Sequence, residues 1–189
     1  MKTNLQKKTL TSLFIAIVIL QSLIPWIGYI PIGPANVTII HITVIAGGVI
    51  LGPSVGAGIG FVWGALSLYH NMVSPTILSA IFLNPLVSIL PRVCVGFLSG
   101  LVYKILDKRL SKFVNRVLVG VLGTITNTSL VIIMTALFAS KAYAAALGIQ
   151  ESAVLETFVA TLGLNFVLEV IVAGMVVPVI GSVFDRLQR

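Results

Sequence analysis

Long hydrophobic runs, separated by proline, glycine or charged residues, make up most of this 189-residue chain. The interval from Thr9 to Pro91 contains no Asp, Glu, Lys or Arg. A water-soluble domain needs charged residues over its surface, whereas apolar runs of about 20 residues suit helices that cross a lipid bilayer. The pattern therefore predicts an all-α integral membrane protein with a single domain over residues 1–189.

The breaks between the runs predict six transmembrane helices. We expect them at residues 9–26, 37–51, 54–69, 86–106, 117–139 and 157–184. Residues 71–85 are apolar but contain Pro75 and Pro85, so this segment is expected to be an outer loop over a pocket. A seventh crossing over residues 76–90 is the alternative.

The distribution of charge predicts the orientation of these helices. The chain carries 12 Lys and Arg against 5 Asp and Glu, a net charge of +7. With six crossings, both termini lie on one side, and nearly all basic residues outside the membrane fall on that side; Lys141 is the exception. Positively charged loops stay in the cytoplasm, so both termini are expected to be cytoplasmic. The surplus of basic residues is thus a topology signal, and no nucleic-acid partner is expected.

Ionisable side chains inside the predicted helices mark a candidate binding site. An ionisable residue at the centre of a membrane helix costs about 2.5–3.5 kcal/mol, so it needs a partner or a function. Arg92 precedes Lys104 by 12 residues, and Glu169 precedes Asp185 by 16 residues. At about 1.5 Å per residue, both side chains belong to the outer half of the membrane. By the same measure, Asn127 lies near the middle.

Two helical faces bring further polar groups to this depth. Asn165 and Glu169 lie four residues apart on one helix. Trp63, Ser67 and His70 share one face of another helix. A small-molecule pocket needs mostly apolar walls with a few fixed polar groups. The candidate substrate-binding residues are therefore Arg92, Asn127, Glu169, Asn165, Trp63, His70 and Asn84.

Each of these residues also has a purely structural interpretation. Arg92 and Glu169 would neutralise each other if they met as an ion pair between two helices. Asn127 and Asn165 would serve in hydrogen bonds between helices, and Trp63 as an anchor at the membrane interface. The gathering of these groups at one depth favours a pocket, but whether Arg92 and Glu169 bind a ligand or each other stays open.

No catalytic or metal-binding pattern accompanies the candidate pocket. The sequence lacks a Gly-Lys-Ser/Thr phosphate loop, a His-Glu-x-x-His motif and a Gly-x-Ser-x-Gly motif. We therefore expect no catalytic residue, no metal and no cofactor in this chain, and any ATP hydrolysis would occur in partner subunits. Cys94 is the one cysteine, and His41 is expected to be a packing residue. An intramembrane enzyme that uses Ser67 and His70 and a structural membrane subunit remain alternatives of a different class.

Several segments resemble one family of membrane transport proteins. The first begins at Ile30 with Ile-Pro-Ile-Gly-Pro, continues through His41-Ile and ends in the Leu-Gly-Pro-Ser-Val-Gly-Ala-Gly-Ile-Gly stretch that begins at Leu51. Pro91-Arg92 and Thr126-Asn127-Thr128 fit the same pattern. Over nearly its whole length the chain resembles the substrate-binding S-components of energy-coupling factor (ECF) vitamin transporters, and among them the pantothenate-type components.

The resemblance implies the membrane subunit of an ABC-type importer that captures a vitamin outside a bacterial cell. Helices four to six and the outer loops would hold the vitamin, with Arg92 pairing with the carboxylate of pantothenate. Pyridoxine, hydroxymethylpyrimidine and riboflavin remain alternative ligands. Helices one to three would face the transmembrane coupling protein EcfT, with Ser12 and Ala16 at the family's small-residue contact, where Ser12 replaces the usual Ala. Two ATPase subunits would supply the energy.

Overall fold

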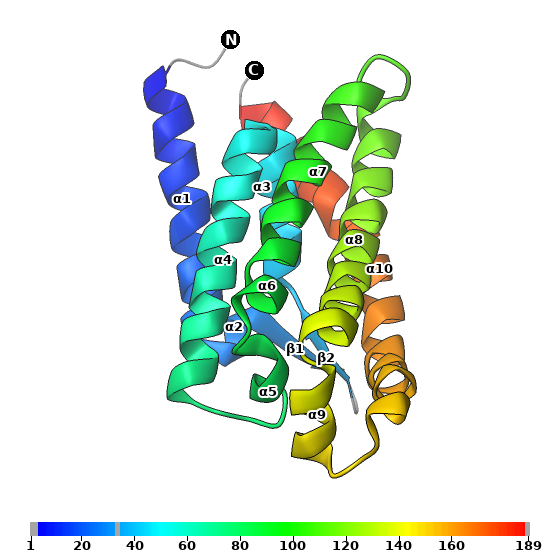
Figure 1. The fold of residues 1–189 in the computed structure, drawn as a ribbon. Helices are drawn as coiled ribbons and strands as arrows, with labels where there is room; N and C mark the ends of the chain where they lie inside the picture. Colours follow the sequence, from blue (N-terminus) through cyan, green and yellow to red (C-terminus); the bar gives the residue numbers. More distant parts are fainter. Residues whose placement is uncertain (1–3, 33–34, 188–189) are drawn as a thin grey trace.

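The computed structural model describes residues 4–32 and 35–187. Within them, six helices of 12 to 34 residues run side by side in one bundle, and we call them the long helices to distinguish them from the shorter connecting elements (Figure 1). They are α1 (Asn4–Leu23), α3 (Ile40–Leu51), α4 (Pro53–Val73), α7 (Leu90–Leu106), α8 (Lys112–Phe138) and α10 (Val154–Leu187). The chain therefore has the helical architecture that the apolar runs predict.

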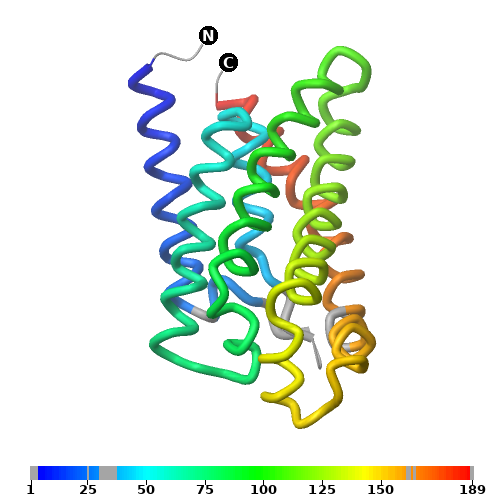
Figure 2. Tube along the Cα trace, viewed as in Figure 1, coloured from blue at the N-terminus to red at the C-terminus, as the bar shows by residue number. Residues whose placement is uncertain are grey.

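Short elements connect the long helices. They are α2 (Pro25–Gly28), β1 (Tyr29–Ile32), β2 (Ala35–Thr38), α5 (Ser79–Phe82), α6 (Pro85–Ser88), α9 (Ser140–Leu147) and the 3-10 helix η1 (Glu151–Ala153). All of them lie toward the same end of the bundle, which we call the hairpin end (Figure 2). The start of α1, the α7–α8 turn and the end of α10 lie at the opposite end, which we call the basic end.

The hairpin is the main departure from the predicted architecture. The segment between the first two long helices was expected to be a loop, with a helix from residue 37. Instead β1 and β2 pair antiparallel, with Tyr29 opposite Thr38 and Ile32 opposite Ala35, and α3 begins only at Ile40. Ile, Tyr, Val and Thr favour strands, and here they outweigh the Pro and Gly residues of the segment.

The segment between α4 and α7 is also more structured than a loop. The helix α4 runs to Val73, and the two short helices α5 and α6 follow. Each of the two contains four residues, whereas a membrane crossing needs about 20. A seventh crossing over residues 76–90 is therefore wrong.

Glycines bring α4 and α7 into direct backbone contact. An added Cβ at Gly56 would meet the carbonyl of Gly96, and one at Gly60 would meet the carbonyl of Arg92. Further along α4, a Cβ at Gly64 would lie 2.7 Å from the Cα of Ile89. Little hydrophobic drive acts between helices in lipid, so such close approach supplies much of the packing. The three glycines four residues apart therefore fix where α7 begins.

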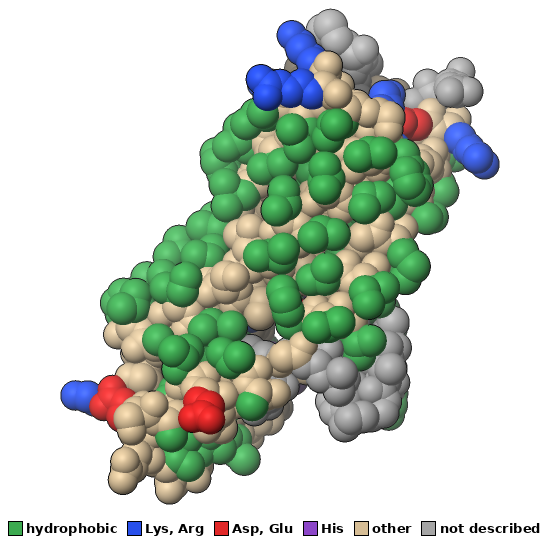
Figure 3. Space-filling view, turned by 90° about the vertical axis from the view of Figure 1, so that its right-hand side faces the viewer, with side chains coloured by type: hydrophobic (Ala, Val, Ile, Leu, Met, Phe, Trp, Pro, Cys, Tyr) green, Lys and Arg blue, Asp and Glu red, His purple; other side chains and the backbone are tan. Residues whose placement is uncertain are grey.

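The outer surface of the bundle is apolar between its two ends. Three stretches of the described residues are long and hydrophobic enough to cross a membrane, Pro85–Leu106, Lys112–Phe138 and Asn165–Leu187, while Ile40–Leu51 is apolar but shorter. Large hydrophobic side chains such as Phe61, Ile171 and Met175 are more than half exposed. Figure 3 shows hydrophobic side chains over the middle of one face and most Lys and Arg side chains at one end. This distribution suits a protein surrounded by lipid.

Candidate ligand-binding site

Arg92 is the centre of the candidate site. Its side chain is only 6% exposed, and its guanidinium carbon lies 5.0 Å from the ring centre of Trp63 and 4.9 Å from that of Phe82. The Nη1 group donates a hydrogen bond to the carbonyl of Val87 at 2.7 Å. The buried Nε has no hydrogen-bond partner in the part of the chain that the structure describes. Arg92 is thus held by aromatic rings while part of its donor capacity is unused.

The local sequence explains why Arg92 is held in this position. Pro91 lies in the first turn of α7, where a missing backbone N–H costs nothing, so the helix starts at Leu90, two residues before Arg92. The preceding α6 ends just before it and presents the Val87 carbonyl to the guanidinium. Gly60 allows the Arg92 backbone to lie directly against α4. The backbone and the side chain of Arg92 are therefore fixed from two sides.

Glu169 lies near Arg92 but is bonded elsewhere. It is 8% exposed, and its Oε1 accepts the backbone N–H of Thr38 on β2 at 2.9 Å. Among the described residues, Arg92 has no carboxylate oxygen within 4 Å. The charges of Arg92 and Glu169 attract each other at longer range. The two residues therefore share a region of the bundle without forming a contact ion pair.

The aromatic neighbours of Arg92 come from two elements. Trp63 on α4 is 5% exposed, so it packs inside the bundle rather than at its lipid-facing surface. Phe82 on α5 is partly buried, and the carbonyl of this residue accepts the hydroxyl of Ser88. Sequence reasoning selected Trp63 but missed Phe82, because the contact depends on how α5 folds back. A cation stacks favourably on such rings, most strongly where water is excluded.

The remaining predicted polar residues differ in how their side chains are used. Asn127 on α8 is partly buried, and its Oδ1 has no hydrogen-bond partner among the described residues. Asn165 on α10 is also partly buried. Asn84 caps α6 by accepting the N–H of Leu86 at 3.0 Å, and it donates to the carbonyl of Phe138 at 3.3 Å. Asn127 therefore has an acceptor available for a ligand, whereas Asn84 already joins two elements of the fold.

His70 and His41 occupy contrasting environments. His70 is exposed in the last turn of α4, where it does not share the burial of Trp63. His41 is fully buried on α3, and its Nε2 lies 3.1 Å from the hydroxyl oxygen of Thr124 on α8. The structure agrees with the expected packing role of His41. It does not join His70 to the residues around Arg92 by any hydrogen bond among those described.

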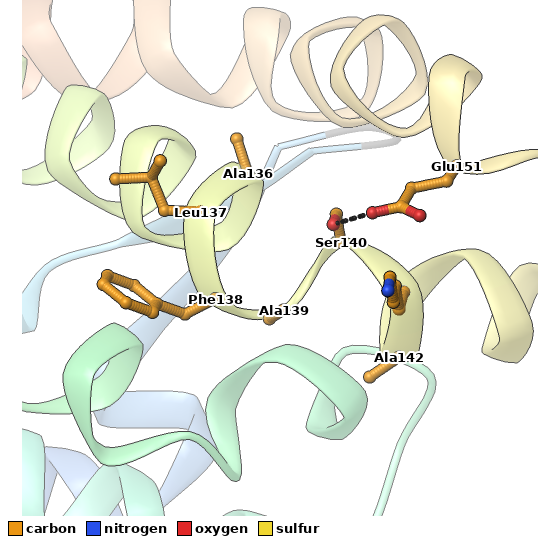
Figure 4. Close-up of a pocket in the computed structure, with 8 residues that line it drawn as sticks. Ala136, Leu137, Phe138, Ala139, Ser140, Ala142 and Glu151 are labelled. Carbon is orange, nitrogen blue, oxygen red and sulfur yellow. Dashed lines mark hydrogen bonds between the residues drawn. The ribbon is translucent and has the colours of Figure 1, made fainter.

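A surface cavity of about 470 Å³ lies apart from these residues. It is formed where α8 ends and α9 begins, and Ser140 donates a hydrogen bond to Glu151 at its edge, 2.5 Å long (Figure 4). Leu137 and Phe138 at its wall are at least half exposed. None of the predicted site residues lines this cavity, so it is not the pocket expected around Arg92.

The described residues contain no group of three His, Cys, Asp or Glu side chains that could hold a metal ion.

The face of α1 that was selected as a partner contact points away from the bundle. Ser12 and Ala16 are exposed, whereas Phe14 and Val18 of the same helix are buried. The helix thus presents its two small residues outward, where another helix can approach them.

Comparisons with known proteins place this chain among transport proteins. The family model described as "ECF transporter, substrate-specific component" matches residues 6–181. "Pantothenate transporter PanT" of Leuconostoc mesenteroides subsp. mesenteroides is 35% identical over 92% of this chain and 89% of the relative. "Pantothenic acid transporter PanT" of Lactococcus lactis subsp. cremoris is 32% identical over 91% of this chain and 90% of the relative.

The matches cover nearly the whole chain and not one motif alone. They confirm the predicted class, a multi-pass membrane subunit that binds a substrate for transport and is not an enzyme. The alternatives of an intramembrane enzyme and of a purely structural subunit are thereby excluded. The chain belongs to the family of substrate-specific components of ECF transporters.

Proposed function

We propose that this chain binds pantothenate on the outside of a bacterial cell membrane and delivers it for import. The observation that carries the proposal is Arg92, a buried arginine with unused hydrogen-bond donors and no carboxylate in contact among the described residues. Pantothenate is an anion with one carboxylate. Both relatives named above are called transporters of this vitamin.

The chemistry of Arg92 suits a carboxylate ligand. A guanidinium has five N–H donors in a planar fork, and one of them is used by the Val87 carbonyl. A carboxylate accepts two parallel bonds from such a fork, and these charge-assisted bonds are stronger than neutral ones. The ligand would also neutralise a charge that is costly to bury. Asn127, with its free acceptor, is suited to a hydroxyl or amide of the same ligand.

A pair of ligands tests the proposal directly. Panthenol carries an alcohol where pantothenate carries its carboxylate, so it removes the charge and leaves most other groups in place. Calorimetric titration of the purified chain should give at least about 30-fold weaker binding for panthenol, since losing one partner of a buried charge pair costs about 2–5 kcal/mol. In Arg92→Gln the two ligands should bind with similar, weak affinity.

The same titration includes the alternative ligands. Pyridoxine, hydroxymethylpyrimidine and riboflavin lack a carboxylate, so the proposal expects none of them to bind as tightly as pantothenate. If a neutral vitamin binds more tightly, or if panthenol and pantothenate bind equally well, the assignment of pantothenate and of the role of Arg92 is wrong. The family membership would not be affected by either result.

We further propose that the six long helices cross the membrane with both termini in the cytoplasm. The exposed basic residues at the α7–α8 turn, such as Lys108 and Arg109, support this orientation. In a Cys94→Ala background, a cysteine at Ser152 should react with an impermeant maleimide added to intact cells. A cysteine at Lys108 should react only after the membrane is opened. The reverse pattern would contradict the orientation.

The proposed partners are the coupling protein EcfT and two ECF ATPase subunits, which would hydrolyse ATP, so that this chain needs no cofactor of its own. The exposed Ser12 and Ala16 on α1 form the proposed contact with EcfT. Ala16→Trp should prevent co-purification of the partners and leave pantothenate affinity unchanged. Leu122→Trp, on the exposed side of α8, is the matched control and should assemble normally. Normal assembly of Ala16→Trp would place the contact elsewhere.

A further inference from the structure

The outer hairpin and α10 are joined by one hydrogen bond between residues far apart in the sequence. Oε1 of Glu169 accepts the backbone N–H of Thr38, and the two residues are 131 positions apart. The strand β2 also packs against α10. The bond therefore connects the end of the hairpin to the helix that carries the candidate residues Asn165 and Glu169.

The register of the hairpin explains why the Thr38 N–H is available. Ile39 donates its N–H to the carbonyl of Gly28 at 2.9 Å, so Gly28 and Ile39 form a hydrogen-bonded pair. The next pair, Tyr29 and Thr38, is then of the non-hydrogen-bonded kind, with its N–H groups directed away from the partner strand. Thr38 thus presents an edge N–H that β1 cannot satisfy.

The backbone N–H of Thr38 and the carboxylate of Glu169 each stabilise the other by this hydrogen bond. An unsatisfied N–H at a strand edge is costly where water is scarce. A buried carboxylate is also costly unless hydrogen bonds or charges compensate it. Glu169 is 8% exposed and makes no contact ion pair with a described residue, so the Thr38 bond is the main direct compensation that the structure displays.

We propose that Glu169 is a positioning residue that holds the outer hairpin in place over the site, and that it does not bind the ligand itself. This inference rests on the proposed function only in that the ligand is taken to be pantothenate. Glu169 uses an oxygen to fix β2, and β1 is fixed in turn because it pairs antiparallel with β2. Loss of the bond frees the hairpin and shortens the residence of the ligand.

The first measurement needs no ligand. Hydrogen exchange of the Thr38 amide, followed in the purified ligand-free chain, should be at least about tenfold faster in Glu169→Ala than in the wild type, because a hydrogen bond to a charged group is lost. Glu169→Gln keeps an oxygen acceptor and should restore most of the protection. Glu156→Ala, an exposed carboxylate on the same helix, is the matched control and should not change the exchange.

A second variant removes the donor and leaves Glu169 in place. Thr38→Pro has no backbone N–H, and it should raise the dissociation rate of pantothenate by about as much as Glu169→Ala, roughly tenfold. The double variant should be no worse than either single one, since both remove the same bond. Unchanged amide protection in α8 would verify that the bundle is still folded.

The results separate this inference from the proposed function. If Glu169→Ala weakens pantothenate binding while Thr38 exchange stays unchanged, Glu169 contacts the ligand and the inference is wrong. It is also wrong if Glu169→Gln is as impaired as Glu169→Ala, or if the effects of Thr38→Pro and Glu169→Ala add. If the wild type fails to bind pantothenate, the proposed function fails, while the exchange measurement still decides the role of Glu169 in holding the hairpin.

Discussion

The bundle buries an arginine toward each of its ends, and the two differ in what neutralises them. Arg92, toward the hairpin end, is 6% exposed, and Arg116, toward the basic end, is 4% exposed. Each guanidinium lies over an aromatic ring, 5.0 Å from Trp63 for Arg92 and 5.9 Å from Tyr103 for Arg116. In each, the buried Nε lacks a hydrogen-bond partner among the described residues.

The difference lies in the carboxylate. Arg116 donates from Nη2 to Oδ2 of Asp185 at 2.9 Å, which makes an ion pair between α8 and α10. Arg92 donates to a neutral carbonyl, and Glu169, the acidic residue whose charge acts on it at longer range, is bonded to Thr38 instead. Burying a charge without a counter-ion costs free energy. Such a charge inside a membrane protein therefore usually has a function, such as binding a ligand. Arg116 holds helices together, whereas Arg92 is held ready for an anion.

The largest expected effect is on ligand affinity, and it distinguishes Arg92 from Arg116. Arg92→Gln should weaken pantothenate binding by at least about 30-fold, because the ligand carboxylate loses its charged partner. Its thermal unfolding temperature should change little, since no protein carboxylate is left unpaired. Arg116→Gln should keep the affinity within about threefold and lower the unfolding temperature. Titration and thermal unfolding of the same preparations provide both readouts.

The opposite result would remove the distinction. If Arg92→Gln unfolds at a much lower temperature and binds normally, Arg92 is a structural residue like Arg116. If Arg116→Gln loses affinity as severely as Arg92→Gln, the two ends of the bundle are coupled more tightly than their separate contacts indicate.

A smaller effect is expected from the glycines against which the two arginines pack. Gly60 meets the backbone carbonyl of Arg92, while a Cβ at Gly181 would lie 2.7 Å from Cδ of Arg116. Overpacking costs about 1–3 kcal/mol. Gly60→Ala should therefore lower both stability and affinity, because α7 must shift, whereas Gly181→Ala should lower stability alone. Gly58→Ala has open space around it and is the control for α4; an equal loss in Gly58→Ala would refute the steric explanation.

Asp185→Asn tests the ion pair at the basic end. It leaves Arg116 buried without its counter-ion, at an expected cost of about 1–3 kcal/mol; the penalty for a fully buried pair is reduced because the Asp185 side chain is 35% exposed. The unfolding temperature should fall by several degrees. Arg116→Gln combined with Asp185→Asn should recover part of this loss, and additive losses would show that the two side chains act independently.

The sequence was sufficient to identify the central residues of the candidate site but not their partners. Arg92 and Glu169 stand out because ionisable groups are rare in membrane helices, and helix length gives their depth. The partners of these residues depend on tertiary contacts across the chain. Thr38 lies 131 residues from Glu169, and Phe82 reaches Arg92 only because α5 folds back. No local pattern records either contact.

The fold, like the site, could be predicted where it depends on local properties of the sequence. Long apolar runs specified the six long helices, because hydrophobic length is a local property of the sequence. The hairpin was missed because its strands are short and contain Pro31. In addition, the backbone N–H of Thr38 is bonded to Glu169 and not to the other strand. Asp185 served only as a marker of the membrane edge, since its pairing with Arg116 depends on how α8 and α10 pack.

The smallest expected effect concerns Lys112, which shares Asp185 with Arg116. Its Nζ lies 3.6 Å from Oδ2 of Asp185, but its side chain is 66% exposed, compared with 5% for that of Arg116. Exposed ion pairs contribute about 0–1 kcal/mol because solvent screens them. Lys112→Gln should therefore leave affinity unchanged and lower the unfolding temperature by no more than about 2 °C. A loss as large as that of Arg116→Gln would mean that the network of three charges, and not the buried pair, stabilises the basic end.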